Sequence, residues 1–336
     1  MPPFEPLAGL LADRLRAEGY SVTCDLPGTL SAGFGPGELS PLAAMVRDAL
    51  PQLELANARG LLLGPGEPPG PAALLRLEPL DRLLQRIDAD WLVEVLRAGR
   101  LASAFQPIFD AHGRLVAHEC LLRGIGPDGA PSIPPGALYG AATTGQLLFA
   151  LDRMARLTHI RNGAPAARAG DLFINFTPAA IYNPAFCLRS TVEAVKSAGI
   201  RPERIVFEVV ETERINDMNH LAAILSVYRA AGFRVALDDF GSGFSSLALL
   251  ERVRPDVVKI DMGLIRNVDT DPYRASITAR IIELARSLGM VTLAEGIETP
   301  GELAWCRKAG ADYFQGYYLG RPAAEPLPAG VAARAA

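Results

Sequence analysis

Short apolar runs of strand length recur along the chain from residue 104 onward. They cover residues 104–109, 115–121, 172–176, 205–209, 235–237, 257–260, 291–294 and 313–314. Helix-like stretches lie between most of them, among them residues 190–198, 221–231, 276–288 and 300–309. Repeated alternation of strands and helices predicts a mainly parallel sheet, either open or closed as a barrel.

The first part of the chain has a less regular pattern. Apolar residues at helical spacing predict helices over 6–19 and 41–55, and residues 58–63 are compatible with a strand. Glycine and proline crowd residues 64–71, which indicates a loop or linker. The apolar stripe from Leu80 to Leu96 predicts a helix with breaks, which packs a core or pairs with a second copy. We therefore divide the chain into an N-terminal region of unknown role (1–88), sensory or dimerising, and a main domain (89–328).

Polar residues follow almost every predicted strand. They are Glu119, Asn175, Glu208, the pair Asp238 and Asp239, Lys259 with Asp261, Glu295 and Gln315. In a strand–helix barrel the C-terminal ends of the strands share one face, so these side chains would meet there. Any one of them has an ordinary explanation, but together they would bury several charges, which is costly without pairing or a metal.

The adjacent carboxylates of Asp238 and Asp239 allow two interpretations. Two like charges so close repel each other unless a cation compensates, which favours a metal site. One aspartate could instead cap a following helix while the other is solvated, and for the pair alone this is slightly favoured. The acidic residues at the other strand ends reverse that preference.

Composition and charge narrow the class of protein. The 336 residues are 49% hydrophobic and 21% charged, which describes a globular chain with an ample core. A net charge of -4 gives no electrostatic basis for binding duplex nucleic acid or an anionic membrane. Because no apolar run reaches about 18 residues and no secretory leader begins the chain, we expect no membrane span and a cytoplasmic location.

With these residues assembled, the chain closely resembles the EAL family of cyclic di-GMP phosphodiesterases over residues 91–322. The resemblance rests on an ordered set of motifs: Phe105-Gln-Pro-Ile108, His118-Glu-Cys-Leu-Leu-Arg123, Phe173-Ile-Asn-Phe176, Glu208-Val-Val-Glu211, Asp238-Asp-Phe-Gly-Ser-Gly-Phe-Ser-Ser-Leu247, Val258-Lys-Ile-Asp261, Ala294-Glu-Gly-Ile-Glu298 and Phe314-Gln-Gly-Tyr317. It implies an α/β fold, a (β/α)8 TIM-like barrel with one antiparallel strand, preceded by a small N-terminal α/β or irregular region. It also implies hydrolysis of cyclic di-GMP to linear 5'-pGpG with magnesium or manganese.

The resemblance assigns roles to the strand-end residues. Glu119, Asn175, Glu208 and Asp238 would ligate one metal ion, Asp238 and Asp239 would help to hold a second, and Glu295 would complete the acidic ring. Oxygen ligands of this kind suit magnesium or manganese better than zinc. Lys259 would position or help to activate the attacking water, and Gln315 would orient water or a neighbouring ligand.

Further residues are implied to bind substrate or to regulate the site. Gln106, Arg123 and Glu298 would contact cyclic di-GMP. Glu211 would anchor the loop after the paired aspartates, and this loop (Gly241, Ser242, Gly243, Ser245 and Ser246) would link the metal site to a dimer interface. The resemblance and the stripe from Leu80 to Leu96 together predict a homodimer.

The alternative to an active enzyme is a catalytically weak or inactive cyclic di-GMP receptor or protein-interaction module on the same barrel. Members of that kind generally lose metal ligands, and none is lost here. Gly124 stands where the family often has tryptophan, and residues 141–145 replace a segment that is usually acidic. These departures bear on substrate affinity more than on the chemical step.

Overall fold

The computed structural model describes residues 4–24, 29–35, 37–68, 70–210, 218–242 and 246–333. The chain divides into two compact units, one of residues 1–98 and 136–148, the other of residues 99–135 and 149–336. Each unit is described by itself below.

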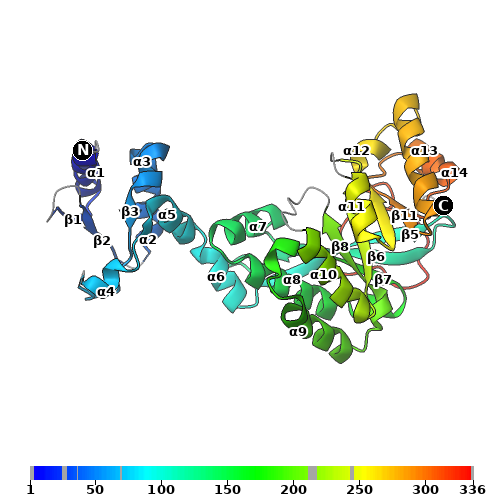
Figure 1. Cartoon of the computed structure of the whole chain (residues 1–336), viewed down its shortest axis with the longest axis horizontal. Coiled ribbons are helices and arrows are strands. Elements are labelled where there is room, and N and C mark those ends of the chain that lie inside the picture. The colour runs from blue at the N-terminus through cyan, green and yellow to red at the C-terminus, as the bar shows by residue number, and fades with distance from the viewer. Residues whose placement is uncertain are drawn as a thin grey trace. The chain divides into compact units, whose positions relative to one another are not determined.

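The larger unit contains a closed barrel of eight strands in the described part of the chain (Figure 1). The strands are β5 (Leu101–Asp110), β6 (Leu115–Gly124), β7 (Asp171–Asn175), β8 (Ile205–Val210), β9 (Arg234–Phe240), β10 (Val257–Ile260), β11 (Val291–Ala294) and β12 (Tyr313–Phe314). Strand β5 is antiparallel to both of its neighbours, β6 and β12, and the other neighbouring pairs are parallel. This confirms the predicted TIM-like barrel with one reversed strand. The reversal is made by a tight turn in which Gly113 N–H donates to Asp110 O at 2.9 Å.

Helices cover the outside of the barrel. They are α8 (Leu148–Gly163), α9 (Pro184–Ser197), α10 (Met218–Ala230), α11 (Ser246–Val253), α12 (Met262–Ile265), α13 (Pro272–Ser287) and α14 (Pro300–Ala309). In the described part of the chain, short 3₁₀ helices also occur at η1 (Ala166–Arg168), η2 (Pro178–Ala180) and η3 (Pro202–Arg204). Local sequence sets the ends of α14: Pro300 follows the N-cap Thr299, which forms a capping box with Glu302, and the C-cap after Ala309 is Gly310, whose φ of 87° favours glycine.

Alternation along the strands decides which residues face the inside of the barrel. One apolar layer inside it is formed by Ile108, Ala117, Phe173, Val206, Ala236, Val257 and Leu293. Because side chains two residues apart lie on the same face of a strand, the next inward position is the polar residue that sequence analysis singles out. Ala117 is followed in this way by Glu119, Val206 by Glu208 and Val257 by Lys259. The polar residues therefore form the next layer inside the barrel, directly adjacent to this apolar layer.

The N-terminal unit is small and mainly helical. It holds α1 (Phe4–Ala17), α2 (Leu39–Ala49), α3 (Gln52–Asn57), α4 (Pro71–Leu74), α5 (Leu80–Asp88), α6 (Asp90–Arg97) and most of α7 (Pro135–Thr144), with the short strands β1 (Ser21–Thr23), β2 (Ser31–Gly33), β3 (Arg59–Gly60) and β4 (Glu78–Pro79). The single helix predicted over 41–55 is two helices, because Leu50 is extended before Pro51, the conformation that proline imposes on its predecessor. The strand predicted over 58–63 is reduced to β3, which pairs with β4.

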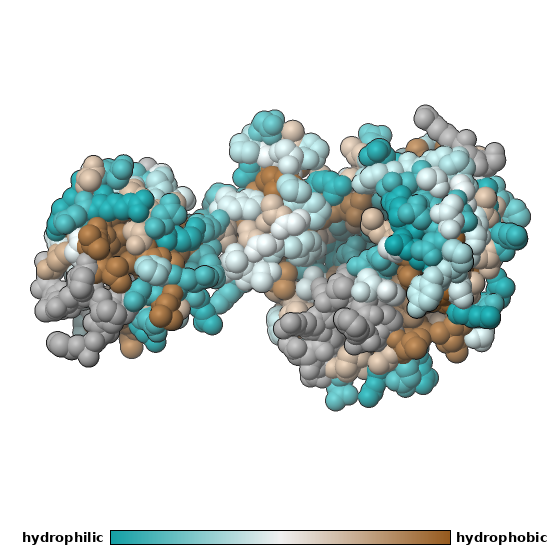
Figure 2. All heavy atoms as spheres, turned by 90° about the horizontal axis from the view of Figure 1, so that it is seen from above, coloured by the Kyte–Doolittle hydropathy of each residue, from teal (hydrophilic) through white to brown (hydrophobic). Residues whose placement is uncertain are grey.

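This unit leaves large apolar side chains exposed, among them Leu10, Leu53, Leu74 and Leu75. Hydrophobic patches are visible between hydrophilic ones on its surface (Figure 2). Among the described residues, no helix combines the length and the apolar character needed to cross a bilayer.

Candidate active site

Lys259 stands at the centre of a ring of carboxylates at the C-terminal mouth of the barrel. Its Nζ atom lies 2.6 Å from Glu208 Oε1, 2.8 Å from Asp238 Oδ1, 2.8 Å from Glu295 Oε1 and 3.6 Å from Glu119 Oε1. Gln315 Nε2 donates to Glu119 Oε2 at 2.6 Å. Side chains on, or directly after, six strands (β6, β8, β9, β10, β11 and β12) are thus joined in one polar network.

Burial makes this network expensive. The side chains of Glu208 and Lys259 are 0% and 1% exposed. Burial raises the pKa of both Glu208 and Glu295 well above the usual carboxyl range, and the ammonium group offsets only part of that effect. Burial alone would lower the pKa of Lys259, but the carboxylates, Asp238 foremost, raise it well above its ordinary value. The ring therefore has more carboxyl groups than one lysine can keep ionised, and a further cation would favour their ionised forms.

The paired aspartates belong to this ring and not to a helix start. Helix α11 begins at Ser246, seven residues after Asp239, so neither aspartate is its N-cap. Asp239 has a φ of 54°, a left-handed conformation, and its N–H donates to Asp238 Oδ1 at 2.9 Å. Such backbone strain at a non-glycine residue concentrates at functional sites. Burial, and then the charge of Asp238, raise the pKa of Asp239 to about 6.

The donor set fits divalent metal ions. Two groups of carboxylates have ligand atoms within 4.8 Å of one another in the described residues: Glu119, Glu208 and Asp238, and Asp238, Asp239 and Glu295. Asp238 is common to both groups. Glu208 Oε2 is buried without a hydrogen-bond donor among the described residues, an acceptor that a cation would satisfy. All these donors are oxygen atoms, which suits magnesium or manganese.

Two other predicted site residues, Asn175 and Gln106, are paired with ring residues on the neighbouring strands. Asn175, at the end of β7, is in register with Glu208, which places it where it can join the first group. Gln106, on β5, is paired directly opposite Glu119, and its Nε2 atom donates to Gly320 O at 3.3 Å.

The two remaining residues predicted to contact substrate, Arg123 and Glu298, have partners within the chain. Arg123 donates through Nη1 to Leu122 O at 2.7 Å. Glu298 Oε2 lies 2.7 Å from Nη1 of Arg266, a residue that sequence analysis did not single out. No sequence pattern marks this pair, because its members are 32 positions apart and follow different strands. Only the neighbouring Thr-x-x-Glu capping box at Thr299 is readable from sequence.

The loop after the aspartates is described only in part. Ser242 N–H donates to Asp239 O at 3.0 Å, and Gly241 has a φ of 99° that favours glycine. Ser246 is the first residue of α11. The predicted residues Glu211, Gly243 and Ser245, and the side chain of Ser246, lie outside the described residues.

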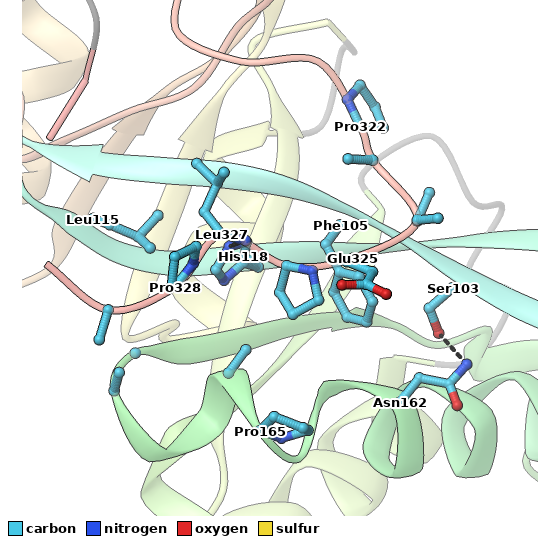
Figure 3. A pocket seen from close by; sticks show the side chains of 18 of the residues that line it. Ser103, Phe105, Leu115, His118, Asn162, Pro165, Pro322, Glu325, Leu327 and Pro328 are labelled. Atoms are coloured by element: carbon cyan, nitrogen blue, oxygen red, sulfur yellow. Dashed lines mark hydrogen bonds between the residues drawn. The ribbon is translucent and has the colours of Figure 1, made fainter. Parts of the chain in front are cut away.

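A separate pocket of about 1020 Å³ lies on the outer face of the β5–β6 hairpin (Figure 3). Its walls are this hairpin, the end of α8 with η1, and the C-terminal segment 322–330. His118 Nε2 accepts a hydrogen bond from Leu327 N–H at 3.0 Å, and Ser103 Oγ is hydrogen-bonded to His159 Nδ1 at 2.8 Å. Among the described residues that line it, Glu325 supplies the single carboxylate, so this pocket lacks the donor set of the ring.

The similarity of this chain to known proteins agrees with the acidic site described above. The family model for the EAL domain matches residues 89–322. The chain belongs to the EAL domain family. The chain is 30% identical over 224 residues to the "probable cyclic di-GMP phosphodiesterase PdeN" of Escherichia coli, a match that covers 65% of this chain but only 43% of that relative.

Two solved EAL structures are also similar. A standalone EAL protein from Vibrio cholerae O395, in its c-di-GMP-bound form, is 38% identical with a TM-score of 0.61, covering 68% of this chain and 94% of that one. The manganese and cyclic di-GMP complex of BlrP1 from Klebsiella pneumoniae at pH 9.0 is 29% identical with a TM-score of 0.59, covering 67% of this chain and 56% of that one.

Proposed function

We propose that this EAL domain hydrolyses cyclic di-GMP to linear 5'-pGpG in a metal-dependent reaction. The observation that carries the proposal is the buried acidic ring around Lys259. Burying this many carboxyl groups at a barrel mouth costs stability, and metal-dependent chemistry would account for their presence. The names of the relative and the bound ligands of the similar structures support the choice of substrate.

Magnesium or manganese ions would be held by the oxygen donors of the ring. Glu119, Asn175, Glu208 and Asp238 would hold one ion, and Asp238, Asp239 and Glu295 a second. Such ions supply Lewis acidity toward the phosphodiester and lower the pKa of water to near neutrality.

The chain's own residues would orient the reaction. Lys259 has three N–H donors, which in this structure face Glu208, Asp238 and Glu295. With those carboxylates holding metal ions, Lys259 would turn a donor to the attacking water and hold it in line with the phosphorus atom. Gln315 fixes the orientation of the Glu119 carboxylate through its amide. Attack of water on phosphorus breaks the bond to the 3'-oxygen, which leaves as a hydroxyl after gaining a proton, and the product keeps a 5'-phosphate.

Substrate contacts are assigned to residues at the rim. Arg123 offers a planar, fork-shaped guanidinium to a phosphate oxygen. Gln106, opposite Glu119, and Glu298, three residues after Glu295, would contact the nucleotide beside the ring.

The proposal includes a homodimer whose interface is linked to the ring by the loop of residues 241–246. The exposed leucines of the N-terminal unit supply apolar surface for a partner copy. Light scattering at micromolar concentration should give twice the 35.8 kDa mass of the chain. A monomeric mass would refute the dimer and leave the proposed chemistry standing.

The experiment that tests the activity is incubation of the purified chain with cyclic di-GMP and either Mg²⁺ or Mn²⁺. We expect pGpG to accumulate, as resolved by chromatography, and EDTA to stop it. If neither metal supports turnover while calorimetry detects binding of cyclic di-GMP, the chain is a receptor and the proposed catalysis is wrong.

A further inference from the structure

Arg266 lies directly after the short helix α12, which follows the strand of Lys259. Its Nη1 atom is 2.7 Å from Glu298 Oε2 and 3.7 Å from Glu302 Oε1. The Arg266 side chain is 28% exposed and that of Glu298 is 47% exposed. The pair therefore lies at the surface, next to the buried ring but outside it.

Glu302 fixes the two sides of this pair relative to each other. Its side chain is 1% exposed, and Oε1 accepts from Asn267 N–H at 3.0 Å. Its Oε2 atom accepts from Glu298 N–H at 2.8 Å and from Thr299 N–H at 3.1 Å. One buried carboxylate thus ties the turn after Arg266 to the turn that carries Glu298.

The backbone around both residues is held further. Arg274 Nη1 donates to Arg266 O at 2.6 Å. Ile297 N–H donates to Gln315 O at 3.0 Å, which fixes the residue before Glu298 to the strand end that contacts Glu119. Because both backbones are fixed, the Arg266–Glu298 pair costs less conformational entropy than an ordinary surface ion pair. Such a pair can set the orientation of a carboxylate.

We propose that Arg266 is a positioning residue that holds the Glu298 carboxylate for recognition of a guanine base, an inference that rests on the proposed function. Arg266 engages Oε2 of Glu298 and leaves acceptor capacity on the half-exposed carboxylate. Guanine presents two adjacent donors, N1–H and the N2 amino group, which a fixed carboxylate accepts together. Adenine has an acceptor at N1, so the same carboxylate repels it. The pair therefore sets selectivity for guanine without touching the reacting phosphate.

The experiment compares Arg266→Gln with a conservative Arg266→Lys variant and with Glu298→Gln. The matched control is Arg280→Gln, because Arg280 makes an ion pair with Glu283 at 2.6 Å on the exposed face of α13. Kinetics are measured with cyclic di-GMP and with bis(p-nitrophenyl) phosphate, a phosphodiester without a base. Binding of cyclic di-GMP and of cyclic di-AMP is measured by calorimetry.

We expect Arg266→Gln to raise KM for cyclic di-GMP about tenfold, which equals about 1.4 kcal/mol, with kcat changed less than about twofold. Turnover of bis(p-nitrophenyl) phosphate should be unchanged, the ratio of cyclic di-GMP to cyclic di-AMP affinity should fall, and Arg266→Lys should restore part of it. The double variant with Glu298→Gln should be no worse than Glu298→Gln alone. The control should match the wild type.

An unchanged KM, or an equal loss on bis(p-nitrophenyl) phosphate, would overturn the inference by making Arg266 purely structural. If the wild type binds cyclic di-GMP without hydrolysing it, the proposed catalysis fails, but the binding ratio of Arg266→Gln still decides the role of the pair. A wild type that binds no cyclic di-GMP overturns both.

Discussion

The two faces of the β5–β6 hairpin are built from alternate residues of the same strands, and their chemistry is opposite. On the inner face Gln106 lies opposite Glu119, beside the carboxylate ring. On the outer face Phe105 and His118 pack edge to face with ring centroids 6.2 Å apart. Buried charged groups on the inner face lower the stability of the fold, whereas apolar burial on the outer face raises it.

The hairpin therefore has two roles, one on each face. The outer face fixes the strands through packing and through backbone pairing of Phe105 with Ala323, while the inner face presents charged groups that would not hold the strands together alone. Substitutions on the inner face should change the rate of hydrolysis, and those on the outer face should change the free energy of unfolding.

The largest expected effect is that of Glu119→Gln, which keeps the shape of the side chain and removes its charge. We expect hydrolysis of cyclic di-GMP to fall by at least about 10³-fold, because a charged metal ligand is lost, while the melting temperature stays the same or rises. Production of pGpG and thermal unfolding followed by circular dichroism check the two halves. The matched control is Glu325→Gln in the outer pocket, which should keep full activity. Equal losses in both variants would show that the two faces do not differ in role.

The second prediction concerns the outer face. Phe105 is 2% exposed within the core between barrel and helices, so Phe105→Ala should lower the free energy of unfolding by about 3–5 kcal/mol. Phe186→Ala is the control, because Phe186 is 62% exposed and should cost about 0.5 kcal/mol or less. Guanidinium unfolding gives both values. At a temperature where the variant stays folded, kcat should be close to that of the wild type, and a kcat loss as large as that of Glu119→Gln would contradict the separation.

Sequence patterns predicted the strands well for a physical reason. A short apolar run that ends in a polar residue leaves little freedom of placement, so β10 (Val257–Ile260), β11 (Val291–Ala294) and β12 (Tyr313–Phe314) have the predicted bounds. The same pattern points to the acidic strand ends, because strand termini in a barrel converge whatever lies between them.

Other parts could not be predicted because tertiary contacts decide them. Sequence analysis assigns no helix over α8, because the polar residues Asp152, Arg156 and His159 interrupt the apolar residues on its buried face. The pairing of the C-terminal segment with the hairpin, through Ala323 and Leu327, joins residues more than 200 positions apart. Nothing in the local sequence encodes such contacts, and the Arg266–Glu298 pair belongs to the same class.

The third prediction uses the pH dependence, without metal, of the carboxylate ring that lies beside the inner face of the hairpin. Because the pKa of Asp239 is raised to about 6, the stability that this group contributes is present below the unfolded value of 3.8 and is lost as pH rises through about 6. The pKa values of Glu208 and Glu295 are shifted in the same direction. In EDTA, the free energy of unfolding of Asp239→Asn should therefore fall less than that of the wild type between pH 4.5 and 7.

Asparagine tolerates the left-handed backbone of Asp239, so this variant tests charge and not conformation. Glu283→Gln, an exposed change on α13, should keep the wild-type slope. Adding Mn²⁺ to the wild type at pH 6 should raise the melting temperature and release protons, which calorimetry in buffers of different ionisation enthalpy detects. Metal binding without proton release would show that the inner carboxyls are already ionised.

The last prediction concerns the outer face, where the sign of the pH dependence is reversed. Burial lowers the pKa of His118 to about 4 and that of His159 to about 3, so both rings are neutral in the folded chain. Their stability contribution is complete above the unfolded value of about 6.5 and is lost as pH falls toward the folded values, by at most about 1.4 kcal/mol per pH unit for each ring. His118→Gln retains an acceptor for Leu327 N–H but takes up no proton, so its stability should fall less than that of the wild type between pH 6.5 and 4.5. Urea unfolding at these two pH values measures the difference, with His112→Gln in the exposed hairpin turn as the control that keeps the wild-type slope. Identical slopes for all three proteins would mean that acid sensitivity does not originate on the outer face, and the opposite titration of the two faces would be wrong.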